Sequence, residues 1–293
     1  LHGIRRECLM DLASVREYLK NYDGPDMQIM EVCGSHTGAI AKNGIPGLLS
    51  PKIHLLSGPG CPVCVTPSSY VDKLIELSMN PKNCIVTFGD LLRVPGSTKR
   101  TLSSARGEGA RVKMVYSPMD TINLALKDPE TDYIFAAVGF ETTTPVYALL
   151  VDEVIRRDLR NVKFLTAIKT MPEVIRYLCE SGAPIDAFIA PGHVSVVTGT
   201  KIYEPIAEEF QIPFGVAGFE GKELLAAIYG ILRSYGKGRV MNFYPSVVRE
   251  DGNPQARAMI DKYFIVHDCA WRGMGIVPGS GKVLREEYRY LDA

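Results

Sequence analysis

Short runs rich in β-branched and aromatic residues alternate along this chain with amphipathic helical patterns. Such runs predict strands at 27–32, 52–56, 84–88, 111–116, 133–138, 162–168, 186–190 and 213–217. Helical spacing of apolar residues predicts helices at 68–80, 117–128 and 171–182, with Ser68 as the N-cap of the first. Because parallel strands are joined by helical crossovers, this alternation indicates an α/β fold. We expect two similar three-layer lobes with mostly parallel sheets and a cleft at the carboxyl ends of the strands.

The length of 293 residues favours about two domains. We expect one α/β lobe over 1–120 and a second over 121–235, followed by a C-terminal segment over 236–293 that packs back on the first lobe. Residues 66–90 and 170–193 share a bend with Pro, a helix and a strand. This weak internal echo supports two similar halves, although two ordinary βαβ units would produce it as well.

Composition limits the classes of partner and the compartment. Lys plus Arg and Asp plus Glu both number 33, so no global field attracts nucleic acid or an anionic membrane surface. The apolar runs are too short to span a bilayer, and the N-terminus lacks the apolar core of a secretory signal. Seven cysteines in a chain of this size do not form a dense disulfide framework, so we expect a cytoplasmic protein. The first residue, Leu1, suggests a fragment or a processed product.

The most informative motif is GPGCPVC, which places Cys61 and Cys64 two residues apart after a bend. A pair with this spacing can form a dithiol/disulfide couple, hold half of a metal site or present a reactive thiolate. A closed zinc site needs four ligands, and no second pair with this spacing exists, although Cys33 and Cys84 could join in space. Redox or labile metal chemistry is favoured, and a zinc knot stays open.

The stretch MEVCGSHT places Cys33 at the end of a strand, with His36 and Thr37 at the start of a helix. We expect the helix N-terminus to lower the pKa of the Cys33 thiol and so favour a nucleophilic or metal-binding thiolate. The alternative is a buried cysteine that acts as a small hydrophobic residue, with Ser35 or Thr37 as an N-cap.

Polar residues follow three further predicted strands. GFETTTP presents Glu141, Thr142 and Thr143, PGHVS presents His193, and VAGFE presents Glu220. Each signal is weak by itself, because caps and loop residues look the same, but together they indicate a site at the strand ends. The remaining cysteines receive structural interpretations: Cys8, Cys84, Cys179 and Cys269.

Six motifs in this order resemble the HypD family of NiFe-hydrogenase maturation proteins: MEVCGSHT, GPGCPVCVTP, GFETTTP, PGHVSVVTG, VAGFE and WRGMGIVPGSG. The resemblance runs from Cys33 to the end of the chain. It implies a scaffold that works with the small chaperone HypC and with HypE, a cyanide donor. On this scaffold an iron carrying two cyanides and one carbon monoxide, Fe(CN)2CO, is assembled before it passes to the hydrogenase large subunit.

The resemblance also implies roles for individual residues. Cys33 would bind the iron together with a cysteine of HypC, and Cys61 and Cys64 would be a redox pair. His36, Glu141 and His193 would belong to the same reactive site. Residues expected to contact the bound iron group are Gly60, Thr37, Thr142, Thr143 and Glu220.

One departure concerns the 4Fe-4S cluster that the family carries on four cysteines of a C-terminal segment. After Cys64 this chain has Cys84, Cys179 and Cys269, none in the family's ligand pattern. We therefore expect a truncated chain or a variant without the cluster, in which scaffold binding persists and reductive chemistry is in doubt. Whether the protein is an enzyme stays open; the competing function is a stand-alone CxxC thiol-disulfide oxidoreductase.

Overall fold

The computed structural model of the protein describes residues 11–293, so Leu1 and Cys8 lie outside the described part. The chain forms two compact units, each discontinuous in sequence. Unit 1 contains the described residues up to Gly60 and Ile175–Asn253; unit 2 contains Cys61–Val174 and Pro254–Ala293. The sequence predicted contiguous lobes with limits at 120 and 235. Instead, each unit is made of two separate segments of the sequence, because strand pairing joins segments that are far apart in the chain.

Unit 1 is built on a parallel sheet with the strand order β2-β1-β7-β8-β9. Its strands are β1 (Met27–Glu31), β2 (Ile53–Ser57), β7 (Ala187–Pro191), β8 (Phe214–Ala217) and β9 (Val240–Asn242). β1 lies between β2 and β7, with Ile29 opposite Ala187. The N–H of Gln28 also donates to Asp186 Oδ2 at 2.7 Å, across a separation of 158 residues.

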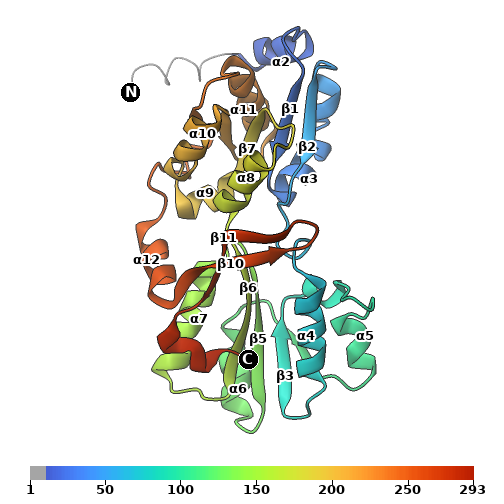
Figure 1. Cartoon of the computed structure of the whole chain (residues 1–293), viewed down its shortest axis with the longest axis vertical. Helices are drawn as coiled ribbons and strands as arrows, with labels where there is room; N and C mark the ends of the chain where they lie inside the picture. Colours follow the sequence, from blue (N-terminus) through green and yellow to red (C-terminus); the bar gives the residue numbers. More distant parts are fainter. Residues whose placement is uncertain (1–10) are drawn as a thin grey trace. The chain divides into compact units, whose positions relative to one another are not determined.

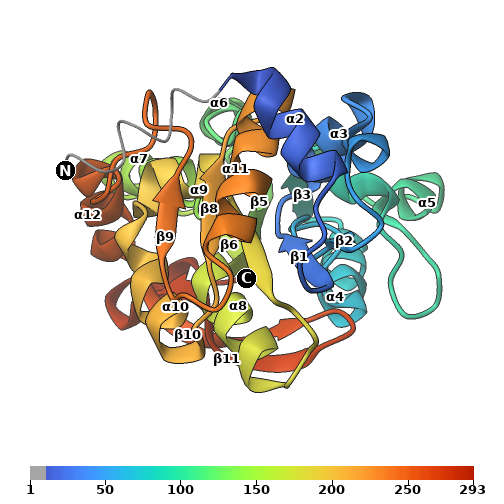
Figure 2. The same ribbon diagram turned by 90° about the horizontal axis from the view of Figure 1, so that it is seen from above.

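Helices cover both faces of this sheet, and Figure 2 shows α2 and α11 on one side and α10 on the other. The core beneath α2 and α11 includes Leu19, Met27, Ile29 and Leu224, all fully buried. The helices and 3-10 turns of unit 1 are α2 (Leu12–Lys20), α3 (Gly34–Lys42), η1 (Ile45–Leu48), α9 (Gly192–Thr198), η3 (Lys201–Tyr203), α10 (Glu204–Phe210) and α11 (Gly221–Arg233). Helix α8 (Met171–Glu180) spans the boundary between the units.

Unit 2 contains a six-stranded sheet with the order β10-β11-β6-β5-β3-β4. The four strands from β6 to β4 are parallel, whereas β10 and β11 form an antiparallel hairpin whose β11 pairs with β6. The strands are β3 (Asn83–Thr87), β4 (Val112–Met114), β5 (Asp132–Gly139), β6 (Val162–Lys169), β10 (Phe264–Trp271) and β11 (Gly275–Leu284).

Figure 1 shows α4 and α5 on one side of the parallel strands of unit 2 and α6 and α7 on the other. One face buries Val71 and Leu74 of α4 against Ile134 and Ala136 of β5. On the opposite face, the Phe135 ring lies 5.4 Å from that of Tyr147 in α7. The helices and 3-10 turns are α4 (Ser68–Ser78), η2 (Leu91–Arg93), α5 (Leu102–Gly107), α6 (Asp120–Lys127), α7 (Thr144–Arg156), α12 (Pro254–Tyr263) and η4 (Glu286–Leu291).

The predicted α/β class is confirmed, and each of the eight predicted strands and three predicted helices is present within a few residues of its expected limits. The strands β9, β10 and β11 were not predicted. Ser68 is the first residue of α4 rather than its N-cap; Pro67 occupies the cap position and offers no side-chain hydrogen bond. Among the described helices, none has the length and hydropathy needed to cross a bilayer.

The packing of strand β5 against α7 can be tested at Phe135. Phe135 is fully buried and contacts the rings of Phe88, Tyr147 and Phe164. Phe135→Ala should lower the free energy of unfolding by about 3–5 kcal/mol, because the lost ring leaves a cavity. Chemical unfolding followed by circular dichroism measures this; Tyr116→Ala, at a side chain that is 89% exposed, should change it by less than about 0.5 kcal/mol.

Candidate functional site

Cys33 lies where β1 gives way to α3. It is the N-cap residue of α3, in extended conformation, and its carbonyl oxygen accepts hydrogen bonds from the N–H groups of His36 at 2.8 Å and Thr37 at 3.2 Å. The thiol is free and half-buried. The β-strand therefore delivers Cys33 to the carboxyl edge of the sheet, and the helix that follows fixes its backbone.

A buried carboxylate, which the sequence did not single out, holds this turn. Glu31 is only 2% exposed; its Oε2 accepts the N–H of Cys33 at 2.9 Å, and its Oε1 accepts the hydroxyl of Thr37. Thr37 therefore positions Glu31 rather than capping the helix. The available signal was an acidic residue near the end of the predicted strand, two residues before the cysteine.

The electrostatics of Cys33 differ from the prediction. Its pKa is raised, first because burial disfavours the thiolate and also because the Glu31 carboxylate is close, whereas hydrogen bonds from Ser35 and His36 act in the opposite direction. The predicted lowering was wrong because desolvation outweighs the helix N-terminus. A bound cation would reverse this balance, since it supplies the missing positive charge.

The glycine-rich loop before Cys61 packs directly on the Cys33 turn. The carbonyl oxygen of Gly60 accepts the N–H of Gly34 at 3.1 Å, and the N–H of Gly58 donates to the carbonyl oxygen of Glu31 at 2.7 Å. A Cβ atom on Gly60 would overlap the backbone N and Cα of Cys33. Gly60 is thus required by close backbone approach, and it immediately precedes Cys61 in the chain.

His36, in the first turn of α3 after Cys33, is fully buried. Its Nε2–H donates to the carbonyl oxygens of Ala217, at 3.2 Å, and Gly218, at 3.0 Å, at the end of β8. Its Nδ1 has no hydrogen-bond partner among the described residues. Burial lowers the pKa of His36 to about 4, so the ring is neutral at pH 7.

Phe219 connects His36 to His193. Its ring centroid lies 4.8 Å from that of His36 and 4.2 Å from that of His193, an exposed residue in the first turn of α9. Glu220 follows as the N-cap of α11; it forms a capping box with Glu223 and an ion pair of 2.8 Å with Lys222. Unit 1 therefore brings Cys33, His36 and His193 to one edge of its sheet.

In unit 2, Cys61 and Cys64 are joined by a disulfide, with their Cα atoms 5.3 Å apart. Cys64 is exposed and Cys61 is half-buried. Arg272, in the turn between β10 and β11, fixes the loop that follows: its N–H donates to Val65 O at 2.8 Å and its Nε–H to Thr66 O at 2.7 Å. The pair is thus accessible to a thiol partner and held by a tertiary contact.

Glu141 lies beyond the end of β5 in unit 2 and is 7% exposed. Its Oε1 accepts the N–H of Met171 at 2.7 Å, whereas its Oε2 has no partner among the described residues. Burial raises the pKa of Glu141 to about 7. Thr142 is exposed, and the Thr143 hydroxyl donates to Phe140 O at 3.1 Å, which closes the turn into α7.

The predicted residues thus form local groups in each unit rather than one ligand set. Within residues 11–293, no group of three or more His, Cys, Asp or Glu side chains could hold a metal ion. The cysteines after Cys64 do not fit a 4Fe-4S cluster: Cys84 is buried in β3, Cys179 lies on α8 and Cys269 lies on β10.

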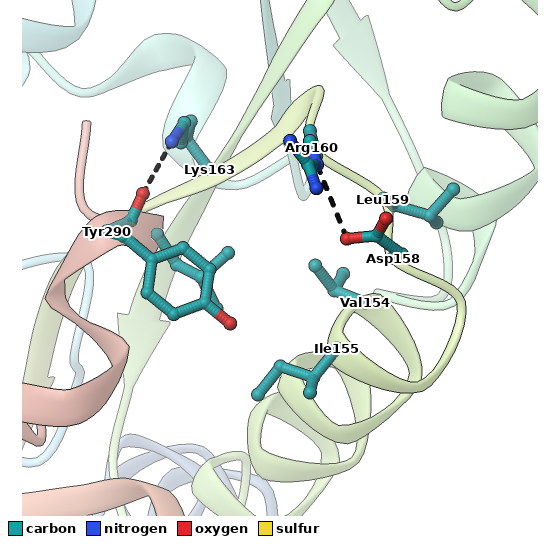
Figure 3. A pocket seen from close by; sticks show the side chains of 8 residues that line it. Val154, Ile155, Asp158, Leu159, Arg160, Lys163 and Tyr290 are labelled. Atoms are coloured by element: carbon teal, nitrogen blue, oxygen red, sulfur yellow. Dashed lines mark hydrogen bonds and ion pairs between the residues drawn. The ribbon is translucent and has the colours of Figure 1, made fainter.

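A pocket of about 410 Å³ lies away from these groups (Figure 3). It is lined by Val154 and Ile155 of α7, by Lys163 near the start of β6 and by Tyr290 of η4, whose carbonyl oxygen accepts a hydrogen bond from Lys163 Nζ. None of the predicted site residues lines it. It lies at the amino end of β6, opposite the edge that carries Glu141.

The close approach at Gly60 predicts a specific sensitivity. Gly60→Ala should displace the loop from Cys33 and raise the alkylation rate of the Cys33 thiol several-fold, because the added Cβ cannot share space with the Cys33 backbone. Gly38→Ala is the matched control in α3, where nothing lies within 4 Å; it should leave the rate unchanged and stabilise the helix by about 0.5–1 kcal/mol. Peptide-resolved alkylation with mass spectrometry measures both. An unchanged Cys33 rate in Gly60→Ala would contradict the packing described.

The raised pKa of Glu141 predicts a pH-dependent stability. The folded state binds the proton more tightly than the unfolded state, so this contribution is full below pH 4.5 and is lost as the pH rises to about 7. The unfolding free energy of the wild type relative to Glu141→Gln should therefore fall by up to about 3 kcal/mol across this range and then stay constant. Urea unfolding at several pH values measures it, and the exposed Glu130→Gln is the control.

Comparisons with known proteins identify the family of this chain. The sequence model of the HypD family, described as the hydrogenase formation hypA family, matches residues 10–293. The hydrogenase maturation factor HypD of Rhodobacter capsulatus is 41% identical over 295 residues, which cover 99% of this chain and 78% of that protein. The HypD of Escherichia coli is 41% identical over 271 residues, covering 91% of this chain and 72% of that protein. A putative hydrogenase expression/formation protein of Methanocaldococcus jannaschii is 40% identical over 268 residues, covering 91% and 74%. The chain therefore belongs to the HypD family of hydrogenase maturation proteins.

Proposed function

We propose that this protein is a scaffold on which the Fe(CN)2CO group of NiFe hydrogenases is assembled and held before transfer to the hydrogenase large subunit. A HypC-type chaperone and a HypE-type cyanide donor are the proposed partners, and the cytoplasm is the proposed compartment, because it keeps a free thiol such as Cys33 reduced. The observation that carries the proposal is Cys33: a free, half-buried thiol at a strand end that belongs to no group of three or more metal-ligating side chains among residues 11–293.

A single thiolate suits an iron that is handed on. Soft thiolate is an appropriate donor for iron with cyanide and carbon monoxide ligands. Because Cys33 is not part of a larger set of protein ligands, the other positions of the iron remain for these ligands and for a thiolate of the partner. Release from this chain then requires only the bond to Cys33 to break, whereas a closed cysteine cage would retain the metal.

The residues around Cys33 have distinct proposed roles. Glu31 and Gly60 fix the backbone of Cys33, and the neutral His36 adds no positive charge to the site. His193 and Glu220 are exposed at the same edge of the sheet and are proposed to contact the iron's ligands or the partner protein. Thr37 acts through Glu31.

Cys61 and Cys64 are proposed to serve as a two-electron couple. Reduction of their disulfide takes up two electrons and two protons and yields two thiols; reoxidation returns them to a partner. Glu141, with a pKa of about 7, is proposed as a proton carrier in unit 2, next to the hydroxyls of Thr142 and Thr143. No step is assigned to a 4Fe-4S cluster, because the described cysteines do not fit one.

A thiol-disulfide oxidoreductase is the second candidate, favoured by the exposed Cys64 in a disulfide with Cys61. It requires neither iron nor Cys33. The two candidates therefore differ in whether Cys33 matters.

The decisive experiment is infrared spectroscopy with iron analysis on the chain copurified anaerobically with its HypC-type partner. The wild type should show bands of iron-bound cyanide and carbon monoxide, and Cys33→Ala should lose at least about 90% of the iron, because the one ligand proposed from this chain is gone and the partner's thiolate alone holds the iron weakly. Cys179→Ala, at another half-buried thiol, should retain the bands.

Retention of the bands in Cys33→Ala would reject the role of Cys33 as the iron ligand. Iron-free wild type that still reduces disulfides through Cys61 and Cys64 would favour the oxidoreductase. Circular dichroism of each variant establishes that the fold is intact.

A further inference from the structure

Lys169, the last residue of β6, is a buried basic residue. It is fully buried, and among the described residues the Cys269 sulfur is a weak acceptor for its Nζ, with no oxygen acceptor in hydrogen-bond range. Nζ lies 5.6 Å from the centroid of the Trp271 ring, on the neighbouring hairpin. A buried ammonium with only a weak acceptor is costly, so its presence calls for an explanation beyond packing.

The titratable neighbour of Lys169 is Cys269 of β10. Burial lowers the pKa of Lys169, and interaction with the Cys269 sulfur opposes this lowering, because a negative sulfur stabilises the ammonium. Cys269 is a free, half-buried thiol. Lys169 and Cys269 therefore form a pair of a cationic and a nucleophilic group inside unit 2.

An irregularity in the β10–β11 hairpin lies next to Cys269. The register of β10 against β11 shifts between His267 and Cys269, a bulge of the kind that redirects a side chain. Close to Cys269 lies Gly281, the register partner of His267, where an added Cβ would lie 2.6 Å from Cys269 Cβ and 3.3 Å from Cys269 Sγ. The missing side chain of Gly281 leaves the space that the thiol occupies.

Both groups line a pocket of about 250 Å³ that is formed by β6, β10, β11 and the start of α4. Lys282 of β11 also lines it and is an additional cation, paired with Asp261 at 3.3 Å. The acidic lining residue is Asp268, whose Oδ1 accepts the N–H of Gly279 at 2.9 Å. The pocket thus offers a thiol, a buried ammonium and space for a small molecule.

We propose that Cys269 is a reactive thiol that forms mixed disulfides with small anionic disulfides bound in this pocket. Cys269 Sγ, as thiolate, attacks one sulfur of the reagent; a new S–S bond forms to Cys269 and the S–S bond of the reagent breaks. The Cys269 sulfur is oxidised, and the second sulfur of the reagent is reduced and leaves as a thiolate that takes up one proton from solvent, equal to the one lost by the Cys269 thiol. Lys169, which lines the same pocket as Cys269, attracts the anionic reagent and so holds it near the sulfur. This site is separate from Cys33 and from the Cys61–Cys64 pair in residues and in role.

The competing interpretation is structural: Lys169 packs its methylene stem on Trp271, and Cys269 reacts only according to its exposure. The two interpretations differ in whether the charge of the reagent matters. The test therefore uses 3,3′-dithiodipropionate, with two carboxylates, and cystamine, with two ammonium groups, at equal concentration on the full chain.

Peptide-resolved mass spectrometry should show Cys269 modified by dithiodipropionate about tenfold faster than by cystamine, and about tenfold faster than Cys179, which is also half-buried. Lys169→Met, which keeps the length of the side chain without its charge, should remove both differences. Lys163→Met, at the other end of the same strand, is the matched control and should retain them.

Equal rates with the two reagents in the wild-type protein would overturn the proposal, as would unchanged rates in Lys169→Met. The wild-type comparison needs no substitution, so it decides the matter even if Lys169→Met does not fold. Thermal unfolding of each variant is recorded alongside the labelling rates.

Discussion

Parallel pairing between β1 and β7 is the contact on which the organisation of the protein depends. It joins two segments separated by 158 residues, and the Gln28–Asp186 hydrogen bond secures the same junction. Because β1 is an interior strand whose second neighbour is β7, the first 60 residues cannot complete a hydrophobic core without the strands that come after β6. Both units are discontinuous for this reason, and the chain passes from unit 1 to unit 2 immediately before Cys61.

The same strand end explains how Cys33 is held. Glu31, at the end of β1, uses both carboxylate oxygens in hydrogen bonds to the turn, and Gly60 packs closely on the Cys33 backbone. Burial and the Glu31 charge raise the pKa of the Cys33 thiol, and a bound cation would lower it again by supplying positive charge. Glu141 and Lys169 of unit 2 are also buried, but each has a polar atom without a hydrogen-bond partner by distance among the described residues. Buried titratable groups of this kind are common at sites of chemistry or ligand binding.

The sequence predicted strands well where the strand is a buried, largely apolar run, as in β5 and β7. It failed for β10 and β11. Most of β10 is at least partly exposed, with His267 and Asp268 in its middle, and β11 contains glycines and a proline. Strands of this kind exist because they pair with one another and with β6, and that pairing is tertiary. The site shows the same division. The motifs identified Cys33, Cys61 and Cys64, whereas Glu31, Phe219 and Lys169 gained their importance from neighbours distant in sequence or from burial.

The sequence by itself determined the α/β class, the family, and the strand ends at which the motifs lie. Local hydrophobic patterns and short sequence motifs are properties of adjacent residues, so they can be recognised without the fold. Only the tertiary structure decided which strands share a sheet, which cysteines are paired and which charges are buried. Desolvation illustrates the difference. It raises the pKa of Cys33, against the expected direction, raises the pKa of Glu141 to about 7 and lowers the pKa of His36 to about 4. Burial of these groups depends on residues from remote segments of the chain, so the sequence could not predict it.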